Sequence, residues 1–213
     1  MDTLKEYGVF LQSRYPEVLS RLGEHLLIVV LAVIAGCILS ITVAILLTRI
    51  KEGVINSLTF GLANIFQTVP TIALLAMLIP LFGVGIYPAI FALFLYSILP
   101  LLRNTYSGIK EVDQSLIESA RGMGFSSMQR LFKVELPLSL PYILSGVRLT
   151  TVYIISWTTL AALIGAGGLG DLIVSGMSTN NNFLIFTGTI SSVILALVVD
   201  FLLNFLVKKT QRA

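Results

Sequence analysis

Charge and sulfur are scarce in this sequence of 213 residues. Only 12% of the residues are charged, against about 25% in an ordinary soluble domain, whereas 56% are hydrophobic. The single cysteine, Cys37, excludes an intramolecular disulfide and a cysteine-based metal cluster. The single histidine, His25, has no second ligand near it in the sequence, so we expect no metal site. The composition therefore indicates an integral membrane protein.

Five apolar runs are long enough to cross a bilayer, which takes about 20 residues of helix. They cover residues 25–48, 57–79, 84–102, 141–164 and 183–207. The sequence thus predicts an all-α integral membrane protein with one transmembrane domain over 25–207. We expect residues 1–24 to form an extracytoplasmic segment and residues 208–213 a cytoplasmic basic tail. These spans leave so little chain that an ATPase or a solute-capturing domain is expected on other polypeptides.

Lysine and arginine gather on one side of the predicted topology. The loop after the first span, the long polar stretch over 103–136 and the C-terminal tail carry most of them, and the other two interior loops carry none. The positive-inside rule therefore predicts an extracytoplasmic N-terminus and a cytoplasmic C-terminus. A net charge of +3 agrees with basic loops and does not indicate nucleic acid as a partner.

The long polar stretch predicts two short helices outside the membrane. Asp113 is suited to cap the first, and Gly122 and Gly124 provide the positive φ that ends it. Its apolar positions fall on one side: Leu116, Ile117 and Ala120. Such a surface has no bilayer to cover it, so it is expected either to dock into a groove of a soluble partner or to fold against its own chain.

The second short helix begins with a capping box. Ser126 and Gln129 have the required spacing, and Leu131 and Phe132 follow as an apolar patch. We expect Pro137 and Pro141 to stop this helix and to lead into the fourth span.

The same stretch resembles the EAA loop of ABC importer permeases. The pattern E-A-A, three residues, G, nine residues, I-x-L-P corresponds here to Glu118, Ser119, Ala120, Gly124, Val134, Leu136 and Pro137, with Ser119 and Val134 as conservative departures. The resemblance implies the type I ABC importer permease fold, with cytoplasmic coupling helices in the loop 103–137. It also implies that these residues couple the spans to a partner ATPase: Glu118, Ser119, Ala120, Gly124, Leu136 and Pro137.

Three further segments resemble the osmoprotectant branch of these permeases. They are QTVPT at 67–71, GVRLT at 146–150 and GAGGLG at 165–170. The resemblance implies import of glycine betaine, carnitine or choline across a bacterial cell membrane. The implied partners are ATPase subunits that bind ATP and Mg²⁺, an extracytoplasmic substrate-binding protein and a second permease subunit. Two alternatives remain: a permease for methionine or another small amine, and a proton-coupled secondary transporter.

Two ionisable residues fall inside predicted spans. Arg148 and Asp200 are expected at similar depths in the fourth and fifth spans, where a buried charge is costly. They are suited to form an ion pair. A structural pair, a pair reaching into a wet cavity, and a proton relay through Asp200 all remain open.

Several other residues are candidates for a translocation path or gate. Asn64 and Gln67 precede Pro70, which is expected to kink the second span and to free a carbonyl. Trp157 lies one turn after Tyr153. The glycine-rich run contributes Gly165, Gly167 and Gly168. Interhelical hydrogen bonding, aromatic packing and a plain turn are the structural alternatives for these three groups.

Overall fold

The structure is a computed structural model that describes residues 2–51 and 53–211, and over these ranges the chain is helical apart from short connections. The elements are α1 (Asp2–Arg49), α2 (Val54–Thr68), α3 (Thr71–Phe82), α4 (Ile86–Lys110), α5 (Gln114–Gly122), α6 (Ser127–Arg130), the π-helix η1 (Leu131–Glu135), α7 (Leu136–Ala161), the 3₁₀ helix η2 (Ala162–Ile164), α8 (Leu169–Ser178) and α9 (Asn182–Thr210).

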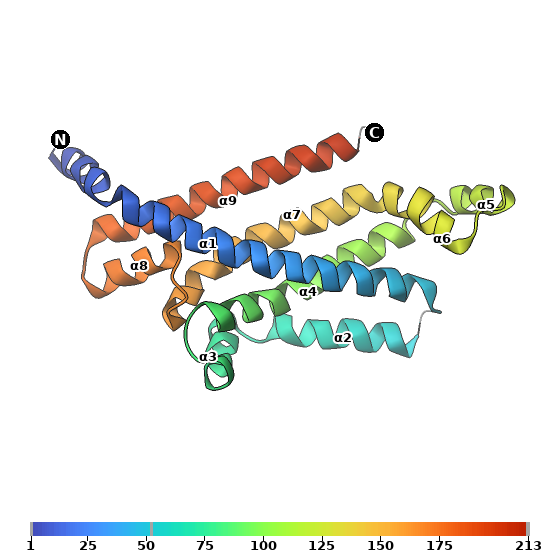
Figure 1. The fold of residues 1–213 in the computed structure, drawn as a ribbon, viewed down its shortest axis with the longest axis horizontal. Coiled ribbons are helices and arrows are strands. Elements are labelled where there is room, and N and C mark those ends of the chain that lie inside the picture. Colours follow the sequence, from blue (N-terminus) through green and yellow to red (C-terminus); the bar gives the residue numbers. More distant parts are fainter. Residues whose placement is uncertain (1, 52, 212–213) are drawn as a thin grey trace.

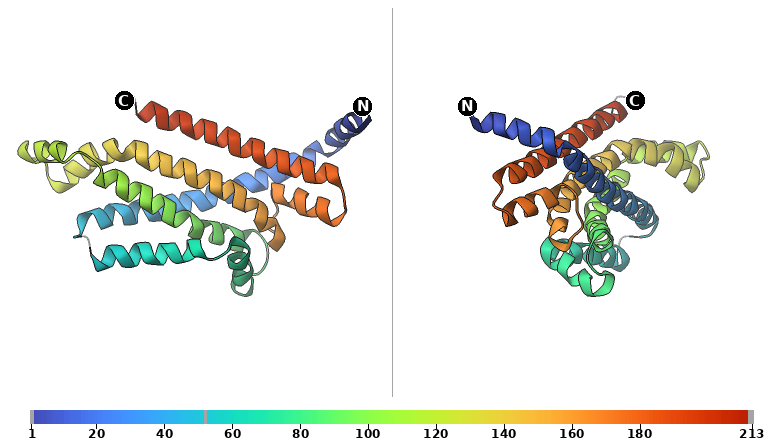
Figure 2. Two further views of the ribbon diagram at one scale, coloured as in Figure 1. Left: turned by 180° about the vertical axis from the view of Figure 1, so that it is seen from behind. Right: turned by 60° about the vertical axis from the view of Figure 1, so that its left-hand side comes forward.

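The long helices run side by side in an elongated bundle (Figures 1 and 2). Helix α4 packs between α1 and α7, and α9 packs on α7 and α8. Fully buried side chains from three helices meet in the centre of the bundle: Ile28, Ala32, Leu93, Tyr96 and Ile154. Outward-facing apolar side chains on the same helices are exposed, as expected of helices that meet lipid.

The bundle has two distinct ends (Figure 1). Helices α5 and α6 project from one end, to which the C-terminal end of α9 also points, and we call it the α5 end. The N-terminal part of α1, the loop over 165–168 and α8 lie at the other, the α8 end. By length and composition, the Lys5–Arg49, Ile86–Lys110, Ser127–Ile164 and Asn182–Thr210 helices can each span a membrane, and α2 with α3 provides a fifth span if the bent pair is counted as one.

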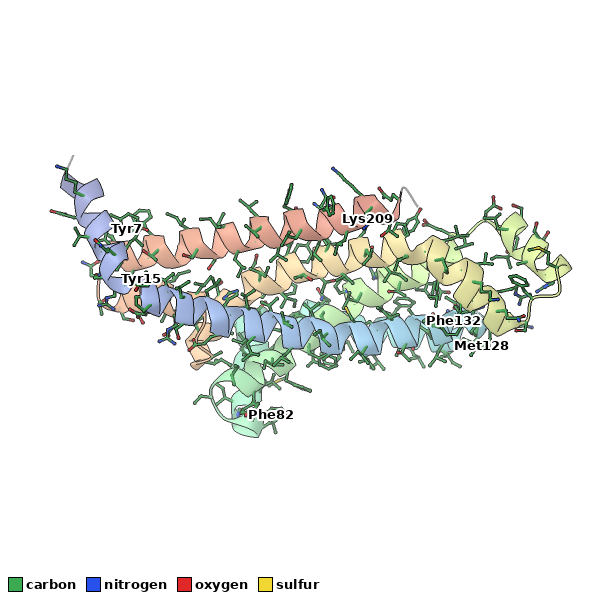
Figure 3. All side chains as sticks on the ribbon, turned by 45° about the horizontal axis from the view of Figure 1, so that its top comes forward. Tyr7, Tyr15, Phe82, Met128, Phe132 and Lys209 are labelled. Atoms are coloured by element: carbon green, nitrogen blue, oxygen red, sulfur yellow. The ribbon has the colours of Figure 1, made fainter. Side chains whose placement is uncertain are left out.

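The span predicted over 57–79 is broken at Pro70, where a kink was expected, and the break is sharper than a kink within one helix. Helices α2 and α3 are separated by a bend of 97°. Pro70 has no N–H and disfavours a helical conformation at Val69, which is extended instead. The Tyr96 hydroxyl of α4 donates to the Val69 carbonyl. Helix α3 therefore leaves the direction of the long helices, with Leu74, Leu75 and Leu78 still buried in the core and Phe82 at its far tip (Figure 3).

The prediction that Pro137 and Pro141 stop the second short helix was wrong. The chain stays helical from Ser127 to Ile164. A proline inside an α-helix clashes with the carbonyl four residues earlier, and the wider π-turn over Leu131–Glu135 sits at that position for Pro137. The extra residue of the π-turn lets the helix pass the proline and continue into α7.

Other boundaries differ from the predicted spans. Helix α1 is continuous from Asp2 through residues 24 and 25, so it crosses the predicted start of the first span without a break. Helix α4 continues past residue 102 to Lys110. Helix α8 was not predicted, because ten residues are too few for a span. The fifth span is confirmed by α9, which extends to Thr210; Met1, Glu52, Arg212 and Ala213 lie outside the described residues.

The contact of α1 with α4 depends on a glycine. A Cβ at Gly36 would lie 1.9 Å from the Ser97 Oγ and 2.9 Å from its Cβ, whereas a Cβ at Gly23 meets nothing within 4 Å. Gly23→Ala is expected to stabilise the detergent-solubilised protein by up to about 1 kcal/mol through helix propensity. Gly36→Ala is expected to destabilise it by about 1–3 kcal/mol through overpacking. Thermal unfolding measures both, and equal effects would contradict the close contact.

Candidate functional site

The α5 end carries a compact helical element formed by α5, α6 and η1, which we call the coupling element. The Asp113 carboxylate accepts a hydrogen bond of 2.8 Å from the Ser115 N–H and so caps α5, as predicted. This hydrogen bond holds the pKa of the Asp113 carboxyl below its ordinary value. Gly124 has φ of +81° and turns the chain towards α6, whereas Gly122 is the last helical residue and has no positive φ.

The predicted capping box at α6 is present. The Ser126 side chain accepts from the Gln129 N–H at 3.3 Å, and the Gln129 side chain accepts from the Ser126 N–H at 2.8 Å. Both short helices therefore start from caps within their own sequence, and their ends do not depend on the bilayer.

The coupling element exposes four large apolar side chains. These are Leu116, Met123, Met128 and Phe132. Figure 3 shows Met128 and Phe132 at this end of the molecule. Glu118 and Ser119 are exposed beside them, and Pro137 is exposed at the start of α7. Apolar groups rimmed by polar ones are typical of a surface that binds another protein.

Ala120 does not lie on that exposed surface. Its side chain is 1% exposed and is buried within the chain, as is Leu131. Leu136 is half-buried. The small side chain at position 120 thus lets α5 fold back closely against its own chain.

Arg148 and Asp200 lie together, as the sequence suggested. The Arg148 guanidinium donates two hydrogen bonds to the Asp200 carboxylate, at 2.6 Å and 2.8 Å, and a third of 2.9 Å to the side-chain oxygen of Asn204. About a third of each charged side chain is exposed, because the pair borders a pocket of about 380 Å³ between α4, α7 and α9. Asn204 was missed, although it lies one turn after Asp200.

The other path candidates do not form one site. Gln67 donates to the Tyr96 carbonyl of α4, so its amide holds α2 against α4, whereas Asn64 is exposed. Trp157 packs on Tyr96, with ring centroids 4.8 Å apart, and on Tyr153 at 5.8 Å. These contacts correspond to the structural alternatives considered for Gln67 and Trp157.

The glycine-rich run forms a loop at the α8 end. Gly165, Gly167 and Gly168 all have positive φ. A Cβ at Gly167 would lie 2.4 Å from Glu24 Oε2, so the loop backbone passes close to α1. The Gly168 N–H donates to the Glu24 carboxylate at 2.9 Å, and the Nε2 of the His25 ring lies 3.1 Å from the Ile155 carbonyl oxygen.

Two groups of charges were missed by sequence reasoning. At the α8 end, Arg21 pairs with Asp171 at 2.6 Å and with Glu24 at 3.0 Å. At the α5 end, Arg49 pairs with Glu135. Arg21 and Asp171 lie far apart in the chain, as do Arg49 and Glu135, whereas Glu24 is only three residues from Arg21. The only signal was the position of scarce charges at the ends of apolar runs.

The fold and these features can be compared with known proteins. Residues 36–212 match the family described as binding-protein-dependent transport system inner membrane component. The chain therefore belongs to this family of membrane permeases. The methionine ABC transporter MetNI in an inward-facing conformation has a similar fold, with a TM-score of 0.82, 25% identity and coverage of 91% of this chain and 96% of that chain. The predicted type I importer permease fold is confirmed.

Particular relatives are more similar in sequence. The glycine betaine/carnitine/choline transport system permease protein OpuCB of Bacillus subtilis (strain 168) is 45% identical over 94% of this chain and 91% of its own length. The carnitine transport permease protein OpuCB of Listeria monocytogenes is 46% identical over 92% of this chain and 88% of its own. The predicted resemblance to osmoprotectant permeases is confirmed.

The Arg148–Asp200 pair allows a direct test of its structural role. Arg148→Leu and Asp200→Leu are each expected to lower the unfolding temperature by a few degrees, because each leaves an unpaired charge within a helix bundle. The double variant is expected to lower it less than either single variant, since no unpaired charge remains. Differential scanning of the purified protein measures all three. Additive losses would show that the two side chains do not act as a pair.

Proposed function

We propose that this chain is the permease subunit of an ABC importer for quaternary ammonium osmoprotectants, namely glycine betaine, carnitine and choline. The observation that carries the cargo assignment is the 45–46% identity, over more than nine-tenths of the chain, to permeases named for these solutes. A quaternary ammonium cannot lose its charge, so it needs a protein path through hydrocarbon. The chain itself performs no chemistry in this proposal.

The coupling element is the proposed docking site for the ATPase. Its exposed Leu116, Met123, Met128 and Phe132 supply an apolar surface, and the exposed Glu118 is available to pair with a basic residue of the partner. ATP with Mg²⁺ would be bound by that partner. Closure of an ATPase dimer would carry the coupling element with it and switch the attached spans between inward-open and outward-open arrangements.

The α8 end is proposed to face outward, towards a substrate-binding protein. Lys110, Lys133, Lys208 and Lys209 fall in the segments of the α5 end, which supports a cytoplasmic position for that end. The N-terminus would then lie outside and the C-terminus inside the cell. The loop with Gly165, Gly167 and Gly168 would form part of the outer gate, and a second permease subunit would complete the path.

Uptake into vesicles tests this proposal. Vesicles containing the chain with its ATPase, its binding protein and any second permease subunit are expected to accumulate labelled glycine betaine, carnitine or choline only with ATP. Gly124→Trp is expected to reduce uptake by about tenfold or more, because a bulky side chain at positive φ strains the turn between α5 and α6. Gly122→Ala, on a helical residue with open space around it, is the matched control and is expected to transport normally.

Three outcomes would contradict the proposal. ATP-dependent uptake of methionine without uptake of quaternary amines would replace the cargo. Normal uptake by Gly124→Trp would remove the coupling element from the mechanism. Uptake without the ATPase that is abolished by a protonophore would favour the secondary-transporter alternative, with Asp200 as the first residue to test.

A further inference from the structure

Arg49 and Glu135 form an ion pair between α1 and the π-helix η1. The two guanidinium nitrogens of Arg49 donate to the two carboxylate oxygens of Glu135, with an Nη1–Oε1 distance of 3.1 Å. The Glu135 side chain is 6% exposed. A carboxylate buried to this extent needs a charged partner, and a fork-shaped guanidinium fixes the geometry of that partner as well as its charge.

The pair lies at the joint between the coupling element and α7. Glu135 is the last residue of η1, which holds one residue more per turn than an α-helix, and Pro137 follows without a backbone N–H. Sites of this kind are where long helices bend. A force applied to α5 and α6 can therefore be lost by bending at the joint before it reaches α7.

Helix α1 makes a second set of polar contacts near its middle, at the α8 end of the bundle. The Arg21 guanidinium lies 2.6 Å from the Asp171 carboxylate of α8, and Glu24 accepts from the Gly168 N–H of the glycine-rich loop at 2.9 Å. Between Arg21 and Arg49 the helix contains no proline, since its only proline is Pro16. This uninterrupted part is about 42 Å long at 1.5 Å per residue, and it extends along the bundle beside α7 and α4 (Figures 1 and 2).

We propose that Arg49 is a positioning residue for coupling. Through Glu135 it braces the π-helical joint against α1, so that α1 and α7 move as one body. Movement of the coupling element then reaches the glycine-rich loop through two connections: the covalent one along α7, and the one along α1 that ends in Arg21 and Glu24. This inference rests on the proposed function, because it assumes that an ATPase moves the coupling element.

Stability alone does not account for this arrangement. The Arg49 ion pair or the Arg21 ion pair alone would add stability without linking the coupling element to the glycine-rich loop. Here the same proline-free part of α1 carries both ion pairs. Coupling between the two ends of the bundle is detected when a change at one end alters a property of the other. The test is therefore a substitution at the α5 end and a measurement at the α8 end.

The experiment follows a single thiol at the α8 end. In a Cys37→Ala background, Ser178→Cys places an exposed thiol at the end of α8. The full complex with the ATPase is reconstituted in nanodiscs, and the maleimide labelling rate is measured with and without a non-hydrolysable ATP analogue. The test variants are Arg49→Gln and Arg21→Gln. Arg49→Lys keeps the charge but loses the fork. Arg14→Gln is the matched control, because it breaks the exposed Arg14–Glu17 pair, which lies within α1 and joins it to no other element.

We expect the nucleotide to change the labelling rate in the parent and in Arg14→Gln. The change should be about tenfold smaller in Arg49→Gln, which frees the joint, and partly restored in Arg49→Lys. It should also be smaller than the parent's in Arg21→Gln, where the Glu24–Gly168 hydrogen bond and the connection along α7 remain. A tenfold loss corresponds to about 1.4 kcal/mol of coupling free energy. Basal ATPase activity should persist in all variants that assemble, as a sign of uncoupling.

A full nucleotide response in assembled Arg49→Gln would overturn the proposal. If Arg49→Gln does not assemble, Arg21→Gln decides, since its change lies far from the joint and a full response there would also overturn the proposal. Absence of a nucleotide response in the parent is a different failure. It would show that no ATPase moves this chain, and the proposed function would fail together with the inference.

Discussion

Hydrogen bonding of the backbone in a medium without water is the constraint on which this structure depends. In hydrocarbon every N–H and C=O must find a partner in the protein, so the chain forms long helices. Where a helix breaks, neighbouring elements supply the partner. The Val69 carbonyl accepts from the Tyr96 hydroxyl, the Gly85 N–H donates to the Ile164 carbonyl, and the Gly168 N–H donates to Glu24. The backbone groups at these helix breaks thus form hydrogen bonds that also hold neighbouring elements together.

Charged side chains follow from the same constraint. Because so few are present, each ion pair between distant segments joins two particular elements: Arg21 with Asp171, Arg49 with Glu135, and Arg148 with Asp200. The Arg49 pair holds the C-terminal end of α1, the Arg21 pair holds its middle, and the third pair lies within the bundle, between α7 and α9. A permease must change conformation while its helices stay folded. Ion pairs between helices allow connected helices to move together as rigid bodies.

Much of the fold was predictable from local signals. Residues 183–207 are apolar with flanking polar groups, and α9 covers them; Asp113 and Ser126 cap the helices that follow them. Proline was the least reliable signal. Pro70 separates two helices that bend by 97°, whereas Pro137 lies inside a continuous helix. The two prolines differ because of their surroundings. The Tyr96 hydroxyl of α4 donates to the Val69 carbonyl at the break before Pro70, whereas a π-turn, held by the Arg49–Glu135 pair, precedes Pro137.

The sequence by itself determined that this chain is a bundle of membrane helices with two capped helices in its long polar stretch, because hydrophobic length, charge position and capping residues act over a few turns of helix. Only the tertiary structure decided which distant charges meet, that α3 turns by 97° from α2, and that Gln67 and Trp157 pack against α4 and its Tyr96. These outcomes depend on contacts between residues far apart in the chain, and no local pattern encodes the partner of a buried polar group.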